Sequence, residues 1–224
     1  MHKDQVLERI LEIGIVPVVR ASSPKEALLA VEAVCAGGIP IVEITMTVAG
    51  ALEVIRQVVR DRGTRTLVGA GTVLDAAAAQ QCLDAGAEFL VSPGLDLETV
   101  ALARQEKKLM MAGALTPTEI MAAVKAGTDF VKIFPCGNLG GPKYIAALKG
   151  PFPNVPMIPT GGVSLETAAD FIRAGAAALG VGGELVSPIA LKSGNPGEIS
   201  RIARLLLAAI AEARKPAAAT ALAK

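Results

Sequence analysis

Short apolar segments alternate with longer helix-like stretches along the chain, and this alternation restricts the folds that it can adopt. Strands that alternate with helices of about 10–15 residues are typical of βαβ units and a parallel sheet. Two of the helix-like stretches are Pro24–Ala36 and Ala49–Asp61. Eight segments fit strands: Ile15–Arg20, Pro40–Met46, Thr66–Gly71, Glu88–Ser92, Leu109–Ala112, Asp129–Ile133, Met157–Thr160 and Ala178–Val181.

A repeated Ala-Gly dipeptide marks where helices end. Glycine easily takes the left-handed conformation that ends a helix, and in each case a predicted strand follows. The dipeptide lies in Cys35–Ile39, Asp84–Glu88, Lys125–Asp129 and Arg173–Ala177. Helix starts are predicted at Ser23-Pro24, at Ser164 with Thr167, and at Thr116-Pro117-Thr118-Glu119.

Eight strand–helix units without an internal linker predict one closed (β/α)₈ barrel, a TIM barrel, over residues 1–213. The first 14 residues predict a short amphipathic N-terminal helix. Residues 214–224 are of low complexity, and we expect them to form a disordered tail. A dinucleotide-binding sheet is disfavoured, because Arg20-Ala-Ser-Ser-Pro24 after the first strand lacks the required glycines.

Composition excludes several classes of function. The formal charge of +1 favours neither nucleic acid nor an anionic membrane as a partner. No apolar run is long enough to span a bilayer or to act as a signal peptide. Three cysteines without a CxxC pair indicate reduced thiols and a cytoplasmic protein. Because His2 is the only histidine and no cysteines are paired in sequence, we expect no metal site and no His-dependent triad. We also expect no cofactor.

Lys132 is an ionisable residue inside the apolar strand segment Asp129-Phe-Val-Lys-Ile133. Strands of a parallel barrel are buried on both faces, so an unpaired charge there is costly. Burial favours the neutral, nucleophilic amine, and barrel active sites lie at the C-terminal ends of strands. Lys132 is therefore a candidate nucleophile. The alternative is a lysine that pairs with Glu43 or extends to the barrel rim.

Glu43 and Arg20 are two further charged residues in predicted strands. Strand alternation places Glu43, Thr45 and Thr47 on one side of their segment. A carboxylate on the inner face is a candidate proton shuttle, although it would also serve as a structural partner for Lys132 or Arg20. Arg20 can hold a substrate carboxylate with two hydrogen bonds or form an ion pair at the barrel mouth.

Glycine-rich turns follow the last two predicted strands, as Thr160-Gly161-Gly162-Val163 and Gly180-Val181-Gly182-Gly183. In barrels, these loops often bind phosphate through backbone N–H groups. Tight turns without a ligand are the alternative. Thr72 and Pro93 follow the third and fourth strands, where each is either a substrate contact or a turn residue.

Six motifs together resemble the class I 2-keto-3-deoxy-6-phosphogluconate (KDPG) and 4-hydroxy-2-oxoglutarate (KHG) aldolases, a group that includes phosphogalactonate aldolases. Six motifs in order are more specific than any one of them, and the resemblance extends from about Ile13 to Val186. The motifs are VEIT (42–45), GAGTV (69–73), SPG (92–94), LTPTE (115–119), VKIFP (131–135) and PTGGV (159–163).

The resemblance implies a metal-free TIM barrel that forms a homotrimer and binds a small 2-keto acid, with a phosphorylated one expected. It implies that Lys132 forms the Schiff base and that Glu43 is the general acid and base. The other residues implied to contact substrate are Arg20, Thr45, Thr72, Pro93, Phe134, Thr160, Gly161, Gly162, Gly182 and Gly183.

Two departures from the family pattern concern how substrate anions are held. Some members have an arginine where this chain has Thr47, whereas others have one at the end of the first strand, which Arg20 matches. The phosphate loop of the family commonly has a serine where this chain has Gly183, and Glu184 follows. A carboxylate therefore lies next to the expected phosphate site.

The resulting hypothesis is a Schiff-base aldolase that cleaves KDPG to pyruvate and glyceraldehyde 3-phosphate, and also KHG to pyruvate and glyoxylate. The alternatives are an aldolase for 2-keto-3-deoxy-6-phosphogalactonate, a non-catalytic barrel that binds phosphorylated keto acids, and another phosphate-binding barrel enzyme such as an isomerase. A binding protein has no need of a buried nucleophilic amine, so Lys132 favours the aldolase.

Overall fold

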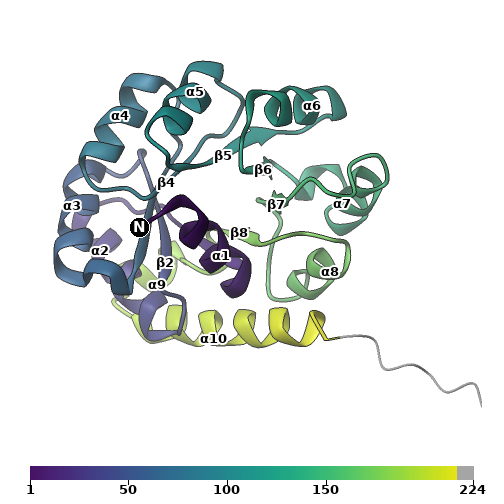
Figure 1. The fold of residues 1–224 in the computed structure, drawn as a ribbon. Coiled ribbons are helices and arrows are strands. Elements are labelled where there is room, and N and C mark those ends of the chain that lie inside the picture. The colour runs from purple at the N-terminus through teal and green to yellow at the C-terminus, as the bar shows by residue number, and fades with distance from the viewer. Residues whose placement is uncertain (216–224) are drawn as a thin grey trace, which may run out of the picture.

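The computed structural model describes residues 1–215, in which eight strands alternate with helices (Figure 1). The strands are β1 (Ile15–Val19), β2 (Ile41–Thr45), β3 (Leu67–Gly71), β4 (Phe89–Val91), β5 (Leu109–Ala114), β6 (Phe130–Ile133), β7 (Met157–Pro159) and β8 (Leu179–Val181). The helices are α1 (Lys3–Ile13), α2 (Pro24–Ala36), α3 (Ala51–Arg62), α4 (Ala76–Asp84), α5 (Leu97–Gln105), α6 (Pro117–Ala126), α7 (Pro142–Lys149), α8 (Ala168–Arg173), α9 (Pro188–Lys192) and α10 (Pro196–Ala213).

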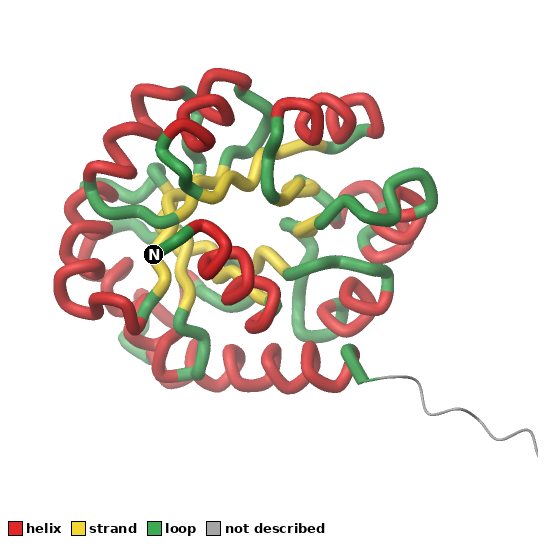
Figure 2. The backbone as a smooth tube through the Cα atoms, viewed as in Figure 1, coloured by secondary structure: helices red, strands yellow, loops and turns green. Residues whose placement is uncertain are grey.

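The strands form a parallel barrel surrounded by helices (Figure 2). Each strand pairs with the next in the chain, and β1 also pairs with β8. A bridge between Thr160 and Gly180 joins the remaining edge, between β7 and β8. The predicted (β/α)₈ barrel with an N-terminal helix is therefore confirmed.

Strand register places Glu43 and Lys132 on the same side of the sheet. Side chains of paired residues in a parallel sheet point to the same side, and side chains along one strand alternate. Glu43 of β2 pairs with Gly69, Gly69 pairs with Phe89, and Phe89 pairs with Leu109. Gly113 lies four residues after Leu109 on β5, so it points to the same side, and it pairs with Lys132 of β6. Both ionisable groups thus project from the same face of the barrel wall.

All eight predicted strands are present, but their ends differ by one or two residues. Arg20 follows β1 instead of ending it, and its side chain is exposed. In contrast, β5 extends two residues beyond Ala112, because Gly113 and Ala114 pair with β6. The helix predicted over Ala49–Asp61 begins later, at Ala51, after Gly50 in the left-handed conformation.

The predicted helix signals are mostly confirmed. Ser23 caps α2, and Thr116 with Glu119 forms a capping box at α6. The start predicted at Ser164 with Thr167 is confirmed in part: Thr167 is the N-cap residue of α8, whereas Ser164 lies in the preceding turn and donates its N–H to Thr167. The glycine of the Ala-Gly dipeptide has a positive φ angle at Gly86, Gly127 and Gly175. At the end of α2, Gly37 has a φ angle of -78° and the following Gly38 takes the positive one.

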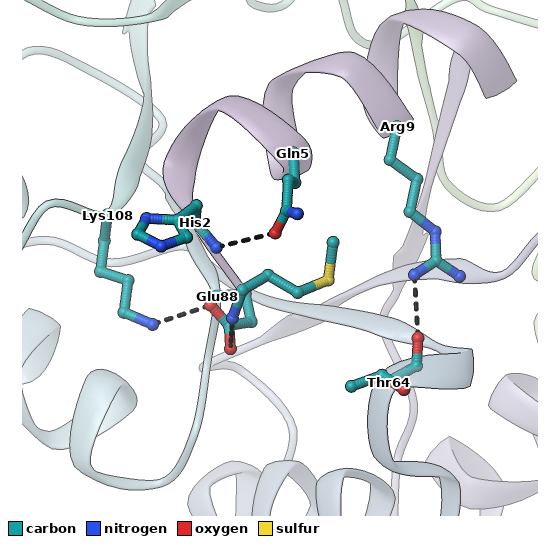
Figure 3. Close-up of polar contacts among 7 residues, drawn as sticks. His2, Gln5, Arg9, Thr64, Glu88 and Lys108 are labelled. Carbon is teal, nitrogen blue, oxygen red and sulfur yellow. Dashed lines mark hydrogen bonds and ion pairs between the residues drawn. The ribbon is translucent and has the colours of Figure 1, made fainter.

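Helix α1 lies across one end of the barrel (Figure 1), and its polar contacts go to residues that precede strands (Figure 3). Arg9 donates to the carbonyl of Thr64, which lies before β3. The N-terminal amine and Lys108 both pair with Glu88, which lies before β4, at 3.0 and 2.7 Å. This end is therefore closed, and a substrate must enter from the opposite end, where the strands finish.

Helix α10 lies along α2 and α8 on the outside of the barrel (Figure 1). Arg214, predicted to lie in the tail, caps α10 and donates to the carbonyls of Leu11 and Glu12 at 2.7 Å. Lys215, also predicted to lie in the tail, pairs with Glu212, and the rest of the predicted tail, residues 216–224, lies outside the described residues. None of the described helices is both long and apolar enough to cross a membrane.

Candidate active site

Lys132 is the only lysine among the described residues that is classed as buried, with 6% of its surface exposed. Its Nζ lies 5.2 Å from the centre of the Phe134 ring, two residues further along. No carboxylate among residues 1–215 forms an ion pair with it, so the alternative of a Lys132–Glu43 pair is not realised. The amine is therefore buried in the barrel without an ion-pair partner among these residues.

Glu43 is 3% exposed and projects from β2 on the same face of the wall. Burial raises the pKa of its carboxyl group, and the positive charges of Lys132 and Arg20 oppose this rise. Its Oε1 atom is buried and has no hydrogen-bond partner among the described residues. A buried polar atom without a partner is unusual, and a bound substrate or water is the natural group to satisfy it.

The carboxylate of Glu43 occupies space that Gly71 leaves empty on the neighbouring strand β3. A Cβ atom built on Gly71 would lie 2.6 Å from Glu43 Cγ and still closer to Oε1. Real Cβ atoms essentially never come within 3.0 Å of another heavy atom. Gly71 therefore fixes where the carboxylate lies, a role that the sequence analysis missed because it depends on strand register.

A cavity of about 390 Å³ opens at the C-terminal ends of β1, β7 and β8. Seven of the residues predicted to contact substrate line it: Arg20, Phe134, Thr160, Gly161, Gly162, Gly182 and Gly183. Neither Lys132 nor Glu43 is among the lining residues, but Phe134, which lines the cavity, lies beside the Lys132 amine. The site has the size and position expected of a ligand pocket in a barrel.

Two opposite charges line this cavity. Arg20 and Glu184 both contribute to its wall, and neither forms an ion pair with another described residue. The ion pair that was an alternative role for Arg20 is therefore absent. Val18, Val163 and Val186 supply an apolar lining that the sequence analysis did not identify.

Three predicted contacts lie outside the cavity lining. Thr45 is fully buried and donates a hydrogen bond to the carbonyl of Val19 at 3.1 Å. Thr72 and Pro93 are half-buried and follow β3 and β4. Thr72 has a φ angle of 56°, which is unfavourable for a β-branched residue and typical of functional sites that hold a strained backbone.

The described residues contain no group of three or more His, Cys, Asp or Glu side chains arranged to hold a metal ion. All three cysteines are free thiols. Burial raises the pKa values of Cys82 and Cys136 to about 11, which keeps these thiols protonated and unreactive. Lys132 is therefore the candidate nucleophile of this site.

The family model of KDPG and KHG aldolases matches residues 6–202. The 2-dehydro-3-deoxy-phosphogluconate aldolase of Pseudomonas aeruginosa is 35% identical over 205 residues, which cover 91% of this chain and 92% of that protein. The KHG/KDPG aldolase of Escherichia coli is 33% identical over 199 residues, which cover 88% of this chain and 92% of the relative.

Solved structures agree with these sequence matches. The KDPG aldolase of Legionella pneumophila, with pyruvate captured as a covalent carbinolamine intermediate, superposes with a TM-score of 0.83. It is 26% identical, and the match covers 89% of this chain and 97% of that protein.

Proposed function

This chain belongs to the KDPG and KHG aldolase family, and we propose that it cleaves KDPG to pyruvate and glyceraldehyde 3-phosphate. Membership makes it a carbon–carbon lyase with the class I chemistry of that family. The observation that carries the proposal is the buried amine of Lys132, which forms no ion pair within residues 1–215 and lies beside Phe134, a residue that lines a ligand-sized cavity.

Lys132 is the covalent catalyst in this mechanism. Its neutral amine attacks the keto carbon C2, and loss of water leaves an iminium ion. The iminium accepts the electron pair of the C3–C4 bond when that bond breaks, which gives an enamine. The neighbouring Phe134 ring lies against the Nζ atom and favours its developing positive charge through the ring face. Pyruvate captured as a carbinolamine in the Legionella relative supports the same first step here.

Glu43 is the proton carrier. As a carboxylate it removes the proton from the C4 hydroxyl while C3–C4 breaks, and C4 leaves as the aldehyde. The proton then returns to C3 of the enamine, and water releases pyruvate from Lys132. Burial raises the pKa of Glu43, which brings it towards the pH range in which one group serves as both acid and base. The unpartnered Oε1 atom is available for this transfer.

The rest of the substrate is proposed to lie along the predicted contacts. Thr72 and Pro93 hold the keto-acid end, with Thr45 supporting the wall beneath, and Thr160 lies near the bound keto acid. Arg20 and the turns containing Gly161, Gly162, Gly182 and Gly183 hold the distal end. Cleavage of the shorter KHG to pyruvate and glyoxylate uses the same two catalytic groups. The phosphogalactonate substrate differs in stereochemistry alone and remains the alternative for this site.

We also propose that residues 1–213 act as a single domain, that three copies form a homotrimer, and that the protein works in the cytoplasm with no nucleic acid, membrane or cofactor as a partner. The trimer rests on the family resemblance, and the compartment rests on the free cysteines. A non-catalytic barrel that binds keto acids is the second candidate. Its buried amine would have no purpose, which favours the lyase.

Pyruvate release from KDPG by wild type, Lys132→Ala and Lys125→Ala tests the proposal. Lys125 is an exposed lysine on α6 and serves as the control. We expect Lys132→Ala to lose turnover while its circular dichroism spectrum is retained, and Lys125→Ala to match the wild type. Turnover by folded Lys132→Ala at the wild-type rate would refute the mechanism.

A further inference from the structure

Glu184 places a carboxylate in the same cavity as Arg20, Gly161, Gly162 and Gly183, and the proposed mechanism does not use it. Its side chain is exposed, and neither a hydrogen bond nor an ion pair joins its carboxylate to any other residue within 1–215. It is therefore free to interact with whatever group fills the distal end of the cavity.

The remaining wall of this end favours hydrogen-bond acceptors. In the described part of the chain, the backbone N–H groups of Gly162 and Gly183 have no acceptor. Arg20 adds a positive charge on the same wall. A phosphate satisfies these donors, and so does a hydroxyl oxygen, so the donors alone do not distinguish the two kinds of substrate tail.

Glu184 does distinguish them, because it only accepts hydrogen bonds and carries a negative charge. A phosphate monoester brings nearly two negative charges and no stable donor, so it is repelled by a neighbouring carboxylate. A hydroxyl group both donates and accepts, so it can donate to Glu184 while its oxygen accepts from the backbone. The positive charge of Arg20 and the negative charge of Glu184 cancel, so these two side chains give this end of the cavity no net charge that would attract a dianion.

We propose that Glu184 is a specificity-determining residue that favours 2-keto acids with an uncharged, hydroxylated tail over their phosphorylated counterparts. This inference rests on the proposed function, because it assumes that Lys132 and Glu43 cleave the keto acid. The phosphorylated acid is then a substrate with a high KM. Discrimination arises from repulsion of the wrong tail as well as from attraction of the right one.

The test compares KDPG with the same keto acid lacking its phosphate, and measures kcat and KM separately from the pyruvate released. Glu184→Gln keeps the shape of the side chain and removes its charge. Glu106→Gln, at the C-terminal end of α5 on the opposite side of the barrel, is the matched control. Inorganic phosphate serves as a competitive inhibitor that reports on the distal end alone.

We expect the wild type to have the higher kcat/KM with the unphosphorylated acid. Glu184→Gln should shift the ratio of the two kcat/KM values by about tenfold towards KDPG, mainly through KM, as expected for removal of a like charge close to a dianion at an exposed site. Inorganic phosphate should also inhibit this variant more strongly. Glu106→Gln should leave the ratio unchanged.

If the protein releases pyruvate but Glu184→Gln leaves the ratio of the two kcat/KM values unchanged, this inference is overturned and the proposed function stands. A folded wild-type protein that releases no pyruvate from either acid would instead overturn the proposed function, and this inference with it. A wild type that prefers KDPG, together with unchanged phosphate inhibition in Glu184→Gln, would also refute the role of Glu184.

Discussion

Replacing Gly71 by alanine tests how strictly the barrel positions its proton carrier. The added Cβ would lie 2.6 Å from Glu43 Cγ and closer to Oε1, whereas real Cβ atoms keep at least 3.0 Å from other heavy atoms. The end of the Glu43 side chain must therefore move by about 1 Å or more. This side chain is flexible and Gly71 has no positive φ angle, so we expect the backbone to accept the methyl group.

The expected cost to activity is much larger than the cost to stability. A displacement of about 1 Å from the productive geometry lowers rates by about 10²-fold, so kcat should fall by about that factor. Overpacking of a core typically costs about 1–3 kcal/mol, which should appear as a lower midpoint in urea. Substrate KM should change less, because Lys132 and the cavity loops are not displaced.

Two variants make the interpretation of Gly71→Ala specific. Gly197→Ala adds a methyl group to α10, where the nearest atom to the new Cβ is 3.5 Å away, and should leave both activity and folding intact. Adding Glu43→Asp to Gly71→Ala shortens the side chain that carries the carboxylate. This double variant should recover part of the lost stability without recovering kcat. A Gly71→Ala protein with kcat within threefold of the wild type would refute the reasoning.

Four further predictions concern individual side chains. Glu43→Gln should lower kcat by about 10²–10⁴-fold in steady-state assays. Because burial raises the pKa of Glu43 above its usual 4.5, ionising this group destabilises the folded protein as pH rises. In urea titrations from about pH 4.5 upward, the free energy of unfolding of Glu43→Gln should therefore increase relative to that of the wild type. Thr72→Gly should relieve the left-handed backbone and raise the free energy of unfolding by up to about 1–3 kcal/mol, while KM for the keto acid rises. Arg20→Gln should raise KM more than it lowers kcat, because Arg20 lines the cavity beyond the reacting atoms. An Arg20→Gln protein with unchanged KM, or a Glu43→Gln protein that loses stability at neutral pH, would contradict these assignments.

The barrel was predictable because its signals are local. Fully buried strands require apolar runs, and each helix that ends at Ala-Gly needs a glycine with positive φ, as at Gly127 and Gly175. Lys132 and Glu43 stand out for the same reason, since each is ionisable within an otherwise apolar strand. Pattern alone therefore identified both the architecture and the two groups that carry the proposed chemistry.

Features that depend on neighbouring strands were not predictable. The space that Gly71 leaves for Glu43 follows from the pairing of β2 with β3, which a single sequence does not specify. Arg20 was predicted to end the first strand because it follows an apolar run directly, yet β1 ends at Val19 and leaves the side chain of Arg20 exposed at the cavity. Ser164 carried the residue type of a helix cap, but its turn with Thr167 delays α8.

Borohydride reduction of the protein in the presence of pyruvate, followed by peptide mass spectrometry, tests the central claim most directly. The account predicts a reduced pyruvyl adduct on Lys132 and on no other lysine, and its loss in folded Lys132→Ala. A folded wild-type protein that gives no adduct, or gives one on a different lysine, would contradict it.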